Sequence, residues 1–167
     1  MRISWRAMIV AAALALAGCG FHLREQAQLP ESLKRLHLEI ADPGSLLVRD
    51  LPDALERAGA QVEEKAGTGI AALRIPVSTL APETLSVGAT ARVREYTMRY
   101  RVEIEAVDAN GTVVLPRQVI ELSRDYTFDE TQALGVAAQE DELKKQLQRD
   151  MVQAILRRLA ALGRPAA

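Results

Sequence analysis

Few side chains in this chain belong to types and spacings that could carry catalysis or hold a metal. The two histidines, His22 and His37, belong to no metal-ligand spacing such as HExxH or a Cys/His pair. The chain also has no GxSxG, P-loop or GxGxxG sequence. Charged residues of both signs interleave along one segment, at Glu95, Arg99, Arg101, Glu103 and Glu105. This alternation favours a salt-bridged strand surface over a general acid–base pair, so we expect no enzymatic activity, no metal and no cofactor.

The remaining reactive group is the thiol of Cys19, the only cysteine, which can form no disulfide within one copy. It follows a positively charged start and an apolar stretch over residues 7–17, which is too short for a bilayer span of about 20 residues. Residues 16–19, Leu-Ala-Gly-Cys, resemble a bacterial lipobox, whose cysteine receives an S-diacylglyceryl and an N-acyl group. We expect residues 1–18 to be a cleaved lipoprotein signal peptide and Cys19 to be the lipid attachment site. The alternative is an ordinary signal peptide with a free cysteine.

A lipid on Cys19 would anchor the mature chain to a membrane, since two or more acyl chains hold a protein there stably. No later stretch approaches the 18 or so apolar residues of a transmembrane helix. Gly20 follows the cysteine, where an aspartate tends to retain bacterial lipoproteins at the inner membrane. The lipobox resemblance therefore implies the outer membrane.

Charge and size limit the class of protein further. Loss of residues 1–18 would leave a chain of single-domain length and remove Arg2 and Arg6, leaving 19 basic against 22 acidic residues. This slightly acidic balance gives no reason to expect nucleic-acid binding.

The hydrophobic pattern predicts two elements in the first part of the chain. Residues 34–40 alternate apolar and polar side chains, which indicates a half-buried strand. A helix is expected between Ser45, as its cap, and Gly59, with Pro52 either kinking it or lying in its first turn after Asp50.

Three strands are expected to follow. The first lies around residues 73–77, where Pro76 indicates a sheet edge or a bulge, and residues 82–90 are expected to form a polar loop. The clearest strand covers residues 94–107, with its even-numbered residues apolar and its odd-numbered residues polar. Asn110-Gly111 then predicts a hairpin, and the return strand again has its apolar residues at even numbers, from Ile120 to Phe128.

This shared parity constrains the hairpin. A two-residue turn at 110–111 would pair even-numbered with odd-numbered residues and would turn one apolar set to water. We therefore predict a turn with an odd number of residues, or a bulge beside Pro116.

A long amphipathic helix is expected from about Gln132 or Val136 to Leu162. Its apolar stripe is Leu143, Leu147, Met151, Ile155, Leu159 and Leu162. The order of elements is thus β-α-β-β-β-α, and the expected fold class is α+β. We expect a two-layer sandwich with two helices on one face of a four-stranded, mostly antiparallel (mixed) sheet. Residues 19–32 would form a lipid-anchored tether, 33–163 the single domain and 164–167 a short tail.

Arg94 and Arg124 fall on even positions of otherwise apolar strand faces. With Arg92, Arg94 could form a basic cluster beside Gly88 that binds phosphate through bidentate contacts. The alternative is that these side chains lie at strand ends and extend to solvent.

The segment from Gly18 to Arg24, Gly-Cys-Gly-Phe-His-Leu-Arg, resembles the start of the LptE family, lipopolysaccharide-assembly lipoproteins of the Gram-negative outer membrane. Weaker similarities continue at residues 29–30, 91–98, 124–126 and 139–141. The resemblance implies a non-catalytic protein that plugs the LptD β-barrel, assists its assembly and takes part in lipopolysaccharide transport. Its partners would be LptD, lipopolysaccharide and the membrane. The family's basic contact positions do not match here, so Arg92 and Arg94 are our own candidates for lipopolysaccharide contact.

Two other functions remain open from the sequence. One is a lipid-anchored periplasmic solute-binding or transport-auxiliary module without a barrel partner. The other is a lipid-anchored hydrolase, which would need a pocket that joins a carboxylate pair or His37 to a nucleophile.

Overall fold

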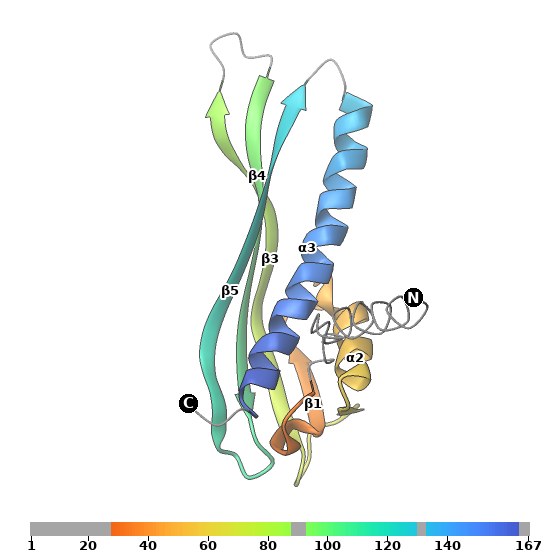
Figure 1. The fold of residues 1–167 in the computed structure, drawn as a ribbon, viewed down its shortest axis with the longest axis vertical. Helices are drawn as coiled ribbons and strands as arrows, with labels where there is room; N and C mark the ends of the chain where they lie inside the picture. Colours follow the sequence, from red (N-terminus) through yellow and green to blue (C-terminus); the bar gives the residue numbers. More distant parts are fainter. Residues whose placement is uncertain (1–27, 88–92, 130–132, 164–167) are drawn as a thin grey trace, which may run out of the picture.

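The computed structural model describes residues 28–87, 93–129 and 133–163. A short 3₁₀ turn, η1 (Glu31–Leu33), precedes β1 (Arg35–Ile40), α2 (Leu47–Arg57), β2 (Gln61–Glu63), β3 (Ala71–Val87), β4 (Val93–Val107), β5 (Val113–Asp129) and α3 (Ala133–Ala161). The strands form one sheet in the order β2-β1-β3-β4-β5, and both α-helices lie on one face of it (Figure 1). The expected two-layer α+β class is confirmed.

The predicted number of strands was wrong, because the described part of the chain forms a sheet of five. The additional strand, β2, is only three residues long, too short for an alternating pattern to show in the sequence. It pairs in parallel with β1, from Arg35 opposite Gln61 to His37 opposite Glu63. The sheet is mixed, since β1 is parallel to β2 and β3 while β3, β4 and β5 are antiparallel. With α2 between them, β1 and β2 form a parallel crossover unit.

Helix α2 begins five residues before Pro52, so the interpretation that places Pro52 in the first turn was wrong. The Ser45 Oγ accepts a hydrogen bond from the Leu47 N–H at 3.2 Å, which satisfies one of the unpaired donors at the start of the helix. Pro52 has no N–H to donate to the preceding turn. Gly59 ends the helix with a φ of +91°, as the sequence predicts.

Strand β3 is much longer than predicted and continues to Val87, so the loop expected over residues 82–90 was wrong as far as residue 87. Residues 88–90 lie outside the described residues. Residues 82–87 are extended because β4 pairs with β3 along its length, with Pro82 opposite Met98 and Glu83 opposite Thr97. Pro76 lies at a register shift between Arg74 and Val77 in a strand that is central in the sheet. It therefore marks a bulge, one residue beyond Ile75, which is the last β3 residue that pairs with β1.

The β4–β5 hairpin contains the predicted irregularity. Val107 pairs with Val113, so the connection has the odd-numbered length that the shared parity requires, and Gly111 adopts a φ of +85° within it. Two further register shifts follow between Ile104 and Val107, where the β5 side contains Pro116. Beyond them even-numbered residues face even-numbered residues, as in the pair Val102–Ile120.

The hydrophobic core lies between the sheet and the helices. The even-numbered residues of β4 from Met98 to Ala106 are buried, and so are Leu147, Met151, Ile155 and Leu159 of the predicted α3 stripe. Polar contacts also fix α3: Gln148 donates to the Leu46 carbonyl at 2.9 Å and to the Asp50 carboxylate at 2.5 Å. Among the described residues, no helix is long and apolar enough to cross a membrane.

Candidate functional surface: the charged open face of the sheet

Among the residues that the structure describes, no helix lies on the face of the sheet opposite α2 and α3 (Figure 1). Successive side chains of a strand point to opposite faces, so the residues that do not enter the core project here. On β3, β4 and β5 and at the end of β1 they form a connected set of ion pairs. We call this set the charged face: Glu39, Arg74, Glu83, Arg99, Arg101, Glu103, Glu105, Arg117 and Glu121.

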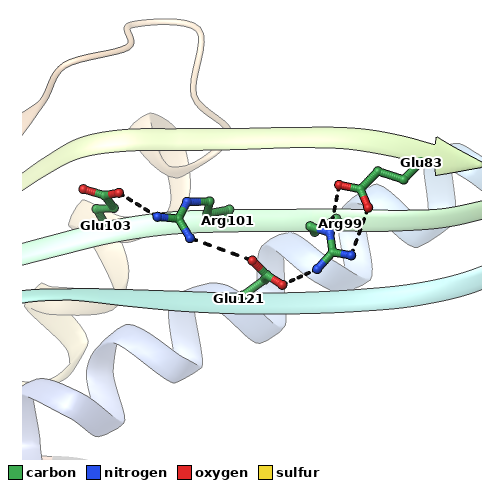
Figure 2. Close-up of polar contacts among 5 residues, drawn as sticks. All are labelled: Glu83, Arg99, Arg101, Glu103 and Glu121. Carbon is green, nitrogen blue, oxygen red and sulfur yellow. Dashed lines mark hydrogen bonds and ion pairs between the residues drawn. The ribbon is translucent and has the colours of Figure 1, made fainter.

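Arg99 links all three long strands at the centre of the charged face (Figure 2). Its Nε and Nη2 each lie 2.9 Å from one oxygen of Glu83 on β3, which is a bidentate contact. Its Nη1 donates to Glu121 on β5. Glu121 also lies 3.9 Å from Arg101, and Arg101 donates to Glu103 at 2.8 Å.

The ion pairs continue toward β1. Arg117 lies 3.9 Å from both Glu103 and Glu105. Arg74 on β3 then joins Glu105, at 3.3 Å, to Glu39, at 3.1 Å. The charged face thus extends from β5 across the sheet to β1.

The neighbouring carboxylates raise the pKa of two of these arginines above its ordinary value. For Arg99 the main cause is the hydrogen bond that it donates to Glu83, followed by the one that it donates to Glu121. For Arg74 it is the hydrogen bond donated to Glu39, followed by the one donated to Glu105. Both side chains are solvent-exposed, so these contacts add little to the free energy of unfolding.

The charged face is hydrophilic, and its paired charges suit it to polar contacts. Each of its arginines already binds a carboxylate, so none is held free for an anionic ligand. Alternating charges can exchange partners with polar groups of another surface at small cost. The arrangement therefore suits a polar partner or a water-filled space.

Most of the predicted site residues lie outside this surface. Cys19, His22 and Arg92 are outside the described residues. Arg94 lies in β4, opposite Val87 on β3 and Phe128 on β5, next to the undescribed connection 88–92. The structure thus places Arg94 at the end of the sheet, as predicted, and leaves its ligand contacts untested.

Arg124 and His37 both have structural partners. The Arg124 guanidinium pairs with Asp150 of α3 at 2.8 Å and also donates to the Ser123 carbonyl at 2.9 Å. The His37 Nδ1 lies 2.8 Å from the backbone oxygen of Glu63 on β2. Within residues 28–87, 93–129 and 133–163, no cluster of three His, Cys, Asp or Glu side chains could hold a metal ion.

Sequence reasoning predicted the alternating charges of β4 but missed their partners on other strands. Glu39, Arg74, Glu83, Arg117 and Glu121 join the charged face only through strand pairing. A periodic signal existed in β3, where Thr79, Ala81 and Glu83 share one face, but the bulge at Pro76 shifts their parity relative to Arg74.

Solved structures share this fold. The chain is similar to the uncharacterized lipoprotein B from Nitrosomonas europaea, with a TM-score of 0.68 and 34% identity over 85% of this chain and 91% of that one. The rare lipoprotein B from Shewanella oneidensis has a TM-score of 0.64 and 26% identity over 75% of this chain and 93% of that one. The fold class is thus that of small bacterial lipoproteins.

Sequence comparison gives the family. A family model for LptE, described as lipopolysaccharide-assembly, matches residues 33–159, and the chain belongs to this family. The LPS-assembly lipoprotein LptE of Pectobacterium atrosepticum is 27% identical over 91% of this chain and 82% of that protein. The protein of the same name from Photorhabdus laumondii is 25% identical over 89% of this chain and 80% of its own.

Proposed function

We propose that this protein is a non-catalytic outer-membrane lipoprotein that fills the lumen of the LptD β-barrel, assists its assembly and takes part in lipopolysaccharide transport. The charged face is the observation that supports this proposal most strongly, because a plug must present polar groups to the water-filled interior of a large barrel. The names of its relatives, LPS-assembly lipoprotein, support a role in the same process.

The proposed anchor completes this assignment. Residues 1–18 are removed, Cys19 carries the diacylglyceryl and N-acyl groups, residues 19–32 form the tether and 33–163 the plug. Three acyl chains hold the protein at the periplasmic side of the outer membrane. Mass analysis of the mature chain tests this directly: the expected mass has three acyl chains on Cys19, and an unmodified thiol or an uncut leader contradicts it.

A pull-down tests the partner. The affinity-tagged, lipidated protein is extracted gently from envelopes, and the co-purified proteins are identified by mass spectrometry. We expect LptD in about equimolar amount. Recovery as a monomer in an inner-membrane fraction would instead favour a periplasmic transport-auxiliary or solute-binding module.

The lipopolysaccharide contact is a separate part of the proposal. Arg92 and Arg94 would bind its phosphate groups, and such contacts weaken as salt screens them. We expect the double variant Arg92→Ala, Arg94→Ala to bind lipopolysaccharide at least tenfold more weakly at low salt, with a smaller dependence on salt. Arg49→Ala, on the exposed surface of α2, is the matched control. Equal binding by wild type and double variant would exclude these two residues.

A further inference from the structure

Strand β5 is 17 residues long and lies at one edge of the sheet, with β4 on its inner side and no other described strand on its outer side (Figure 1). An exposed edge of this length is a template for pairing with another chain unless it is short, covered or broken. On β5 the bulges near Pro116 break one end. Farther along, the Arg124 side chain bonds to the Ser123 carbonyl. Residues 118–123 lie between these two features.

The Ser123 contact also indicates which backbone groups of β5 point outward. The N–H and C=O of one strand residue point to the same side, and those of the next residue point to the other. A carbonyl that accepts from a side chain is typically one that the ladder leaves unused, and the Ser123 carbonyl accepts from Arg124. Because pairing with β4 is regular from Gln118 onward, we therefore expect the groups of Val119 and Glu121 to point outward as well. They are available to a partner strand, while those of Ile120 and Leu122 belong to the β4 ladder.

An open groove of about 500 Å³ lies along this edge, between β5 and α3. Val119, Ile120, Leu122 and the small side chain of Ala154 supply apolar surface. Val119 is 42% exposed, so apolar area remains to be covered there. A strand added to β5 would cover Val119 on one face and lay alternate side chains over the groove on the other.

The groove is positively charged. Arg157 and Arg158 of α3 line it, and both side chains are exposed. Within the described part of the chain, Arg158 has a neutral partner, Gln118, at 2.8 Å, and Arg157 has no carboxylate partner. The groove's own carboxylate, Glu121, is already held by Arg99 and Arg101. The two arginines therefore lack the charge compensation that the charged face has.

We propose that residues 118–123 of β5, together with Arg157 and Arg158, form a docking site for an extended strand of a partner protein that carries acidic side chains at alternate positions. Its backbone pairs with the outward groups of Val119 and Glu121, and its carboxylates lie over the groove against the two guanidinium groups. The site shares Glu121 with the charged face, but it uses the backbone of that residue while the charged face uses its carboxylate. It does not rest on the proposed function, since no barrel is needed to form it.

The test measures residue-by-residue amide exchange of the full-length lipidated chain in detergent micelles, with and without a synthetic peptide. The peptide is Thr-Glu-Val-Glu-Val-Glu-Val-Thr with blocked ends, and its control has glutamine in place of each glutamate. In the free protein we expect fast exchange at Val119 and Glu121 and slow exchange at Ile120 and Leu122. The acidic peptide should slow exchange at Val119 and Glu121 at least tenfold, and the glutamine peptide should bind more weakly.

Two variants separate the backbone and charge contributions. Val119→Pro removes an outward N–H without removing a β4 hydrogen bond and should weaken peptide binding at least tenfold, whereas Val119→Thr should retain it. Slow exchange at Ile120 and Leu122 in the proline variant verifies that the ladder is intact. Arg157→Glu with Arg158→Glu should also weaken binding at least tenfold, with Arg57→Glu on α2 as the charge control.

Three results would overturn the proposal. One is slow exchange at Val119 and Glu121 in the free monomer. Another is failure of the acidic peptide to bind, or equal binding by wild type and both variants. The third is protection of these amides that rises with protein concentration alone, which would assign the edge to a second copy of this chain.

Discussion

At the scale of single residues, charge compensation distinguishes the two sides of the sheet. On the open side, arginines and glutamates satisfy one another while remaining exposed. On the helix side, several polar side chains bond to a neighbouring element, as Gln148 does to Leu46 and Asp50. Tyr126 is an example: it is 5% exposed, its ring stacks on Tyr96 with centroids 5.6 Å apart, and its hydroxyl donates to Glu140 of α3 at 2.8 Å.

This environment makes stability depend on alkaline pH. Burial, and secondarily the hydrogen bond to Glu140, raise the pKa of Tyr126 above its ordinary value. A raised pKa in the folded state means that the contribution to stability is complete below the unfolded tyrosine pKa of about 10 and is lost as pH rises above it. We expect the free energy of unfolding, measured in urea, to fall as pH rises from 9 to 11. Burial raises the Tyr100 pKa as well, so Tyr126→Phe should reduce this fall without removing it.

The same substitution has an effect at neutral pH. Tyr126→Phe removes one hydrogen bond and should lower the free energy of unfolding by about 0.5–1.5 kcal/mol. A pH dependence unchanged from wild type would show that Tyr126 does not titrate in this range.

At the scale of elements, the sequence predicted what depends on local pattern. The α3 stripe, the even-numbered core of β4 and the odd-length connection to β5 follow from side-chain periodicity and register. The missed features depend on partners distant in sequence. Strand β2 exists because β1 offers its edge, and residues 82–87 are extended because β4 pairs with them. For the same reason, only the β4 part of the charged face could be predicted, because its partners lie on other strands.

The apolar contact between α3 and the sheet should make the largest contribution to the free energy of unfolding. Met151 is fully buried there, so Met151→Ala would leave a cavity and cost about 2–5 kcal/mol. Gln153, exposed on the opposite side of the same helix, is the control, and Gln153→Ala should change stability by less than about 0.5 kcal/mol. Urea unfolding of both variants measures this. Equal costs would show that α3 does not pack on the sheet as described.

The β4–β5 connection should also respond to a single substitution. Gly111 has a φ of +85°, which side chains with a Cβ rarely adopt, although its Cβ position is open. Gly111→Ala should therefore destabilise by about 1 kcal/mol through backbone strain alone. Asn110→Ala is the matched control, since the Asn110 contact to Asp108 uses its backbone N–H. A Gly111→Ala variant as stable as wild type would contradict the left-handed turn.

At the scale of the whole molecule, the two faces of the sheet have different tasks. One face and the two helices make a hydrophobic core that needs no partner, while the other face presents paired charges to its surroundings. A lipid anchor near the N-terminus would hold such a body beside a membrane without inserting it. Together these features support the proposed role of the protein as a plug in the water-filled lumen of LptD.

Charge reversal on the charged face is the most direct test of this account. Arg99→Glu with Arg101→Glu places carboxylates among Glu83, Glu103 and Glu121, so the face becomes strongly acidic while the core is untouched. The lipidated variant, shown to be folded by circular dichroism, is used to pull down LptD from solubilised envelopes beside wild type and Arg57→Glu. The account predicts at least tenfold less co-purified LptD for the double variant and no change for Arg57→Glu. Recovery of LptD equal to wild type by the double variant would contradict it.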